Sequence, residues 1–230
     1  MVSIDTVYQR VLAIANKEQR GYITPQEFNL FANQAQMEIF EQYFYDMNQF
    51  GKVPGNSTEY SDMLDLLKEK ISIFKKEEDL NVVGGVIDYP SNAYRIGELF
   101  HNFAAFGQRK IQQVDKKELN LMKRSSLLKP SRFNPVYTDA DKKFTFHGLI
   151  DFDLNISYIK KPITADWGYN VIGEHAINNP SASVDFELHE SEETSLVMKI
   201  LSLAGITLKD ITLYQAGQNS ENAKIQQEKQ

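Results

Sequence analysis

The chain of 230 residues contains no cysteine, which excludes disulfides, thiolate metal ligands and cysteine nucleophiles. It also lacks any run approaching the ~20 apolar residues that a membrane-spanning helix needs. Residues 1–5 show no basic region followed by an apolar stretch, so we expect no signal peptide. The sequence therefore predicts a protein that is made in a cytoplasm, stays soluble and has no membrane partner.

Basic charge is scarce as well. The sequence has 25 Lys and Arg against 31 Asp and Glu, which gives a formal net charge of −6. Proteins that hold nucleic acid by its phosphates usually expose a basic surface, because released counterions drive binding. We therefore expect no tight grip on nucleic acid, although passive contact with DNA is compatible with this charge.

Aromatic residues are more plentiful, with fourteen Phe and eleven Tyr, although there is only one Trp. Aromatic side chains bury large areas and are enriched where proteins meet. The hydrophobic share of 42% is enough for a real core. Two interpretations stay open: a larger core, or a core together with interfaces.

The first 80 residues have the pattern of helices. Thr24-Pro25-Gln26-Glu27 has the form of a capping box with proline at the first helical position. The helix it opens, from 25 to about 47, carries two offset apolar stripes instead of one. This pattern predicts contact on two sides, within the subunit, between subunits, or both. The stripes consist of Phe28, Ala32, Ala35, Ile39 and Tyr43, and of Phe40, Phe44 and Met47.

Strand patterns begin after residue 80. Period-two alternation is clearest within 136–158, where Phe152, Leu154, Ile156 and Tyr158 alternate with polar residues. We expect another strand at 183–188, a short helix opened by a second capping box at 115–118, and a solvated charge run at 75–79. Helical patterns return after residue 190: one helix ends at Gly205, a second covers 208–216, and 218–230 form a polar tail.

These patterns predict an α+β fold in which a discontinuous helical domain from both termini carries an inserted antiparallel β domain. We place the N-terminal helical part at 1–80, the β-rich insert at 81–189, and the C-terminal helices and tail at 190–230. The two helical parts are expected to pack together, because neither alone is large enough for a core.

Catalytic and metal-binding motifs are missing, so we expect no enzyme, cofactor or metal site. Asp139-Ala140-Asp141 suggests a calcium loop, but Phe144 and Ile150 stand where glycine and glutamate are needed, so a turn between strands is favoured. The four histidines show no zinc spacing. A hydrolase acting through Asp151 or His147 would need a cleft that joins residues far apart in the sequence.

One basic patch stands out, at Lys123-Arg124 and at Lys129-Pro130-Ser131-Arg132-Phe133. A solvated loop is the simplest interpretation, but the patch also suits phosphate or the acidic groups of a neighbouring subunit. With the apolar stripes it supplies the candidate interface residues. These are Phe28, Phe31, Phe40, Tyr43, Phe44, Lys123, Arg124 and Arg132.

Five segments carry a likeness to a known family. They are Tyr22-Ile23-Thr24-Pro25-Gln26-Glu27-Phe28-Asn29, Ala35-Gln36-Met37-Glu38-Ile39-Phe40-Glu41, Asp88-Tyr89-Pro90 before Tyr94-Arg95, Phe186-Glu187-Leu188-His189 before Glu192-Glu193, and Val197-Met198-Lys199-Ile200-Leu201. They resemble the ring, or head–tail connector, proteins of crAss-like phages and related marine podophages, which are similar in layout to the tail-tubular adaptor proteins of short-tailed phages.

The resemblance implies a virion structural protein of the neck, arranged as a homo-oligomeric ring of about twelve copies below the portal protein. Such a ring links capsid to tail, contacts other neck or tail ring proteins, and leaves a channel through which DNA passes. It implies no catalytic residue. An acidic chain suits such a channel, because like charge prevents DNA from sticking.

A different class of function stays open beside this one: a carbohydrate- or receptor-binding virion module with a β-sandwich. In that case Tyr137, Trp167 and Tyr169 would form an exposed aromatic platform. A lone tryptophan is more often part of a core or an interface.

Overall fold

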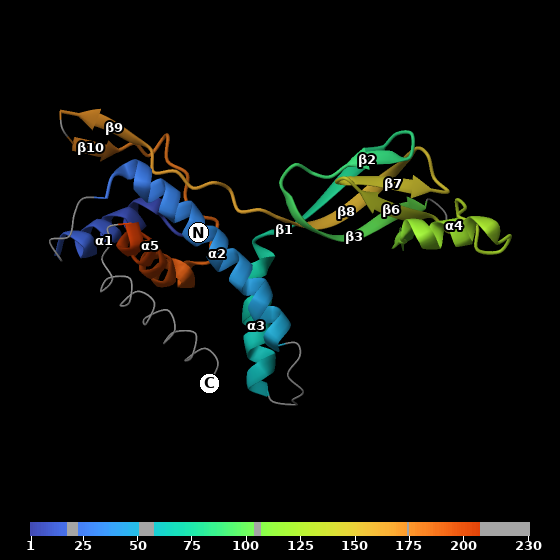
Figure 1. The fold of residues 1–230 in the computed structure, drawn as a ribbon, viewed down its shortest axis with the longest axis horizontal. Helices are drawn as coiled ribbons and strands as arrows, with labels where there is room; N and C mark the ends of the chain where they lie inside the picture. The colour runs from blue at the N-terminus through green and yellow to red at the C-terminus, as the bar shows by residue number, and fades with distance from the viewer. Residues whose placement is uncertain (18–22, 51–57, 104–106, 174, 208–230) are drawn as a thin grey trace. The chain divides into compact units, whose positions relative to one another are not determined.

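The computed structural model describes residues 1–17, 23–50, 58–103, 107–173 and 175–207 (Figure 1). The fold is α+β, and the strand ladders are antiparallel except for a two-residue parallel pair. The chain divides into two compact units, a helical unit of residues 1–73 and 162–230 and a β unit of residues 74–161. The division therefore falls at 73/74 and 161/162, whereas the sequence analysis placed its boundaries at 80/81 and 189/190.

The helical unit contains most of the helices. The capping box at the start of α2 is confirmed: the Glu27 amide donates to Thr24 Oγ1 at 3.3 Å, and the Thr24 amide donates to Glu27 Oε2 at 3.0 Å. The described elements of this unit are α1 (Ile4–Lys17), α2 (Pro25–Phe50), α3 (Thr58–Ser72), β9 (Tyr169–Ile172), β10 (His175–Asn178), the 3-10 helix η1 (Glu190–Glu192) and α5 (Glu193–Thr207).

The core of the helical unit lies around α2, which packs against α3 and α5, while α1 also packs against α5. Both apolar stripes of α2 are covered by the chain itself, apart from Met47, which is half-buried. The ring of Tyr8 lies 4.8 Å from that of Phe28 and 4.1 Å from that of Trp167. The predicted contact on two sides of α2 is thus already made within one chain.

An extended segment, residues 162–168, returns the chain from the β unit and lies along α2. Ala165 exchanges two hydrogen bonds with the Asn33 side chain, at 2.8 and 2.9 Å. The Trp167 amide donates to Asn29 Oδ1 at 2.9 Å, and Gln36 Nε2 donates to the Ile163 carbonyl at 2.8 Å. We call Asn29, Asn33 and Gln36 the amide ladder, because they replace a neighbouring strand for this segment.

The spacing of the amide ladder follows from the two backbone periods. Positions 29, 33 and 36 lie on one helix face and span roughly 10 Å at the helical rise. Residues 163, 165 and 167 alternate along an extended chain and span roughly 13 Å. The two rows are close enough in length for three successive side chains to reach three alternate peptide groups.

The β unit is built from two four-stranded sheets, with orders β1-β8-β3-β4 and β2-β7-β6-β5. Leu154 and Ile156 from the first sheet and Phe144 and Phe146 from the second share one buried cluster. The elements are β1 (Lys75–Val82), β2 (Val86–Asp88), β3 (Ala93–Phe103), β4 (Gly107–Lys110), β5 (Gln112–Gln113), α4 (Lys116–Arg124), β6 (Val136–Ala140), β7 (Lys143–His147) and β8 (Phe152–Lys160).

The alternation predicted within 136–158 is confirmed, and most side chains of the charge run 75–79 are solvated as predicted. This run is nevertheless part of β1, which pairs with β8 over its whole length. Two other predictions are wrong. Residues 183–188 form only the isolated bridges Asp166–Val184 and Val2–Phe186. Gly205 is buried inside α5, where packing outweighs its low helix propensity. The predicted helix 208–216 and tail 218–230 lie outside the described residues.

We expect Asn33→Ala to lower the free energy of unfolding by about 1–3 kcal/mol, because it leaves the backbone of Ala165 without two hydrogen bonds. Urea unfolding would be followed by circular dichroism and by the fluorescence of Trp167, the only tryptophan, which lies in the same segment. Asn48→Ala, at an exposed position of α2, is the matched control. Equal stabilities of the two variants would contradict a structural role for the ladder.

Candidate assembly surfaces

The aromatic interface candidates on α2 belong to the core of the subunit. Phe28 and Phe40 are 0% exposed, Tyr43 is 4% and Phe44 is 7% exposed, and Phe31 is half-buried. A side chain already buried in its own subunit is not available to a neighbour. Phe28, Phe40, Tyr43 and Phe44 are therefore corrected from interface candidates to core residues.

The three basic candidates behave differently, because Lys123, Arg124 and Arg132 are all exposed. Lys123 and Arg124 lie in the last turn of α4, where positive charge is favourable at the carboxyl end of a helix. Arg132 lies in the loop that follows. The structure thus brings all three onto one helix–loop segment of the β unit.

Helix α4 is attached by one face only. Leu119 is buried and Met122 is partly buried against Val114 and Val136. The helix predicted after Asp115 is confirmed, but the predicted capping box is wrong, because the Asp115 side chain makes no capping hydrogen bond. The helix is held in place mainly by this apolar contact with β6.

Apolar side chains are exposed on the remainder of this segment. Leu121 is 62% exposed, Leu127 90%, Leu128 53% and Phe133 65%. We call residues 116–133 the α4 platform; Figure 1 shows α4 and the loop after it at one end of the β unit. The sequence pattern indicates the basic residues of this platform but not its exposed leucines. The pair Leu127-Leu128 between Ser126 and Lys129 was the available signal, since a short polar loop cannot bury both side chains.

The loop of the α4 platform has a fixed shape. The Leu128 amide donates to Ser125 Oγ at 3.2 Å, and Ser131 and Asn134 exchange backbone hydrogen bonds at 3.1 and 3.3 Å. The loop also packs closely on Gly148, where an added Cβ would lie 2.6 Å from the Ser131 carbonyl oxygen and where φ is +98°. The exposed apolar side chains are therefore presented on a preformed surface.

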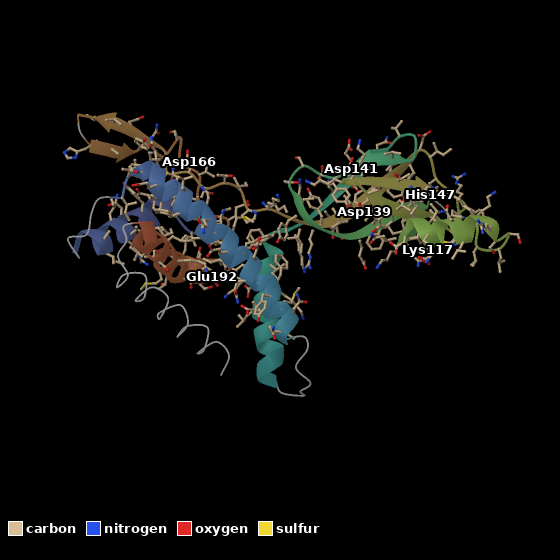
Figure 2. The ribbon with its side chains drawn as sticks, in the orientation of Figure 1. Lys117, Asp139, Asp141, His147, Asp166 and Glu192 are labelled. Atoms are coloured by element: carbon tan, nitrogen blue, oxygen red, sulfur yellow. The ribbon has the colours of Figure 1, made fainter. Side chains whose placement is uncertain are left out.

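The α4 platform has the opposite charge to the rest of the protein. Residues 116–133 include six basic residues and one acidic residue, which leaves 19 basic and 30 acidic residues for the remaining chain. Figure 2 labels Lys117 on α4 and His147 on the neighbouring strand β7. The pKa of His147 is lowered by burial and, secondly, by the positive charge of Lys123. The surroundings at the end of β7 therefore favour the neutral form of the His147 side chain.

A second group of exposed apolar side chains lies in the helical unit, on the hairpin of β9 and β10, with Ile172 and Ile177 on one face and Val171 on the other. The four residue pairs of this hairpin run from Tyr169–Asn178 to Ile172–His175. Its exposed apolar residues are Val171 at 66%, Ile172 at 64% and Ile177 at 50%. A two-stranded hairpin is only marginally stable by itself in water, so these side chains would gain from being covered.

The aromatic platform of the binding-module hypothesis is not formed. Trp167 is 1% exposed and Tyr137 is 6% exposed. Trp167 Nε1 donates to Asp5 Oδ1 at 2.9 Å, and Tyr169 stacks on the Trp167 ring at 5.8 Å. The prediction that these three residues form an exposed sugar-binding surface is wrong, because Trp167 and Tyr137 belong to the cores of different units.

The candidate acidic and histidine residues have structural partners. Asp151 Oδ1 accepts a hydrogen bond from the Gly84 amide at 2.9 Å, and His147 Nε2 lies 3.3 Å from Thr138 Oγ1. Asp141 and Lys142 adopt positive φ angles of 55° and 56° between β6 and β7, so the predicted turn is confirmed. Within the described residues, no group of three or more His, Asp or Glu side chains is placed to hold a metal ion.

No protein-family model matches the sequence, and no curated protein matches it. None of the helices in the described ranges combines the length and apolar character that a membrane span requires.

A pH titration tests the environment of His147. Because folding lowers the pKa of this histidine, the unfolded chain takes up its proton first as the pH falls below the ordinary value of 6.5. The free energy of unfolding should therefore decrease below that pH and level off once the folded state is also protonated. His147→Gln should remove this part of the acid destabilisation.

The measurement is urea unfolding at several pH values between 7.5 and 5. His175→Gln, at an exposed position of β10, is the matched control and should retain the acid destabilisation due to His147. A wild-type pH dependence that survives unchanged in His147→Gln would contradict the assignment.

Proposed function

We propose that this chain is a virion structural protein that forms a homo-oligomeric ring in the neck, below the portal, linking capsid to tail around a DNA channel. The observation that carries the proposal is the exposure of apolar side chains in two separate places. One is the α4 platform of the β unit, and the other is the β9–β10 hairpin of the helical unit.

A closed ring needs head-to-tail contacts, so each subunit must present two different surfaces that fit each other or fit further elements of the neighbour. Large exposed apolar side chains that gather on a preformed segment are typical of protein contacts. In the ring, the discontinuous helical domain and the inserted antiparallel β domain each supply one contact region. We place the ring in the virion, with about twelve copies that are made in the host cytoplasm.

The proposal includes no catalytic role and no cofactor. Asp151 stabilises a turn through the Gly84 amide, and His147 lies against Thr138 in the sheet. The net charge of −6 suits a channel wall that repels DNA, because like charge prevents capture during passage. The partners are the portal protein and the other ring proteins of the neck or tail.

The mass of the assembled species tests the proposal. We expect the purified chain, alone or with the portal protein encoded by the same genome, to form one discrete high-order oligomer in native mass spectrometry and light scattering. Electron microscopy should show a ring with a central opening. A chain that stays monomeric at high concentration and with the portal present would overturn the proposal.

The hairpin supplies a separate mutational prediction. Val171→Ser with Ile172→Ser should raise the concentration at which half of the chains are assembled by about tenfold or more, because exposed apolar contact area is lost. Circular dichroism should be unchanged, since both side chains point into solvent in the single subunit. Leu66→Ser, at a 53% exposed position on α3, is the control and should assemble normally. Unchanged assembly of the hairpin variant would remove the hairpin from the contact.

A further inference from the structure

The outer face of the β1-β8-β3-β4 sheet carries an acidic row. Glu77 lies opposite Ser157, Asp79 opposite Asn155, and Asn81 opposite Asp153 in the register of β1 and β8. Alternate residues of a strand share a face, so Glu77, Asp79 and Asp153 lie together, and all three are exposed. The intervening residues, including Leu154 and Ile156, point into the core.

The acidic row is accompanied by amide, aromatic and basic side chains on the same face. Asn155 Nδ2 donates to Asp79 Oδ1 at 2.8 Å, which fixes the carboxylate. Phe100 lies opposite Asn155 and is half-buried, so the face also has an apolar centre. Three basic residues share this face: Lys75 lies at the end of the row, Arg95 lies opposite Ile159 on β3, and Lys110 is paired with Glu98. The acidic row is therefore confined to β1 and β8, where Glu77, Asp79 and Asp153 outnumber Lys75. We call this surface the acidic sheet face.

We propose, building on the ring proposed above, that the α4 platform of one copy docks on the acidic sheet face of the next copy. Charge selects this partner: the platform has six basic residues and one acidic residue in a chain that is otherwise strongly acidic. The exposed apolar side chains of the platform favour a protein partner over nucleic acid. Phosphates would leave Leu121, Leu127 and Leu128 in water, whereas Phe100 and the stems of neighbouring side chains can cover them.

Both surfaces belong to the same compact unit, on different sheets. The α4 platform is attached through Val114 and Val136 at the β5–β6 end of one sheet, while the acidic sheet face is the outer side of the other. One β unit therefore carries both halves of the contact. Repeating the contact adds β units head to tail, which is the interface type that closes into a ring.

A charge exchange tests this pairing on the full-length chain. Lys123→Glu with Arg124→Glu should raise the concentration for half-assembly by about tenfold or more, and Glu77→Lys with Asp79→Lys should do the same. The chain that carries all four substitutions should recover assembly to within about threefold of the wild type, because the charges are exchanged between partner surfaces. Lys142→Glu with Lys143→Glu, at exposed positions in the β6–β7 turn and at the start of β7, is the control for charge, and Lys143→Ala controls for the loss of its exposed ion pair with Asp88.

The outcomes separate this inference from the ring itself. Recovery in the fourfold variant supports the pairing. If the wild type assembles and neither double variant weakens assembly, or if the fourfold variant is worse than both, the pairing is overturned while the ring proposal stands. A wild-type chain that remains monomeric with the portal overturns both. Loss of binding to duplex DNA in Lys123→Glu with Arg124→Glu, with assembly unchanged, would assign the platform to nucleic acid instead.

The absence of cysteine allows a second measurement that does not depend on stability. Leu127→Cys and Glu77→Cys chains would be mixed under assembly conditions and treated with a short bifunctional maleimide. Cross-links between the two different variants support the pairing. Cross-links only between two Leu127→Cys chains would indicate a two-fold contact and would overturn it.

Discussion

The amide ladder of α2 is the constraint on which the helical unit depends. An extended segment laid against a helix finds no backbone partner there, since the helix uses its own peptide groups. Asn33 supplies both a donor and an acceptor to Ala165, while Asn29 and Gln36 serve the peptides on either side. On the other edge of the same segment, the backbone of Asp166 exchanges two hydrogen bonds with that of Val184. Through this segment the chain that leaves for the β unit is returned to the helices.

This arrangement also explains which apolar side chains are buried and which stay exposed. Segment 162–168 brings Trp167 onto Tyr8, and α2 also packs against α3 and α5. Most aromatic side chains of α1 and α2 are therefore buried within the helical unit, although Tyr45 is 54% exposed. Exposed apolar side chains occur singly on several elements, for example Leu30 on α2, and in groups of three or more on the α4 platform and the β9–β10 hairpin.

Some signals confined to a few neighbouring residues were predictable, although the same capping pattern at Asp115–Glu118 forms no side-chain cap. The Thr24–Glu27 capping box needs only its own turn, and the alternation of Phe152, Leu154 and Ile156 needs only the strand period. β1 was not predictable, because its charged residues become a strand only through pairing with β8. Nor does a sequence pattern distinguish a stripe buried by its own chain from one buried by a neighbouring copy, which is why Phe28 and Phe40 were assigned to an interface. The exposure of Leu127 required the tertiary structure for the same reason.

The charge pattern bears on the symmetry of the proposed contact. Two α4 platforms brought together would repel each other, as would two acidic sheet faces, so both two-fold arrangements are disfavoured by like charge. Only the mixed pairing places opposite charges across the contact, and this pairing is directional. The excess of acidic residues elsewhere then acts against non-specific association, because surfaces of like net charge repel each other. A single basic segment in an acidic chain thus favours head-to-tail closure over both pairing and aggregation.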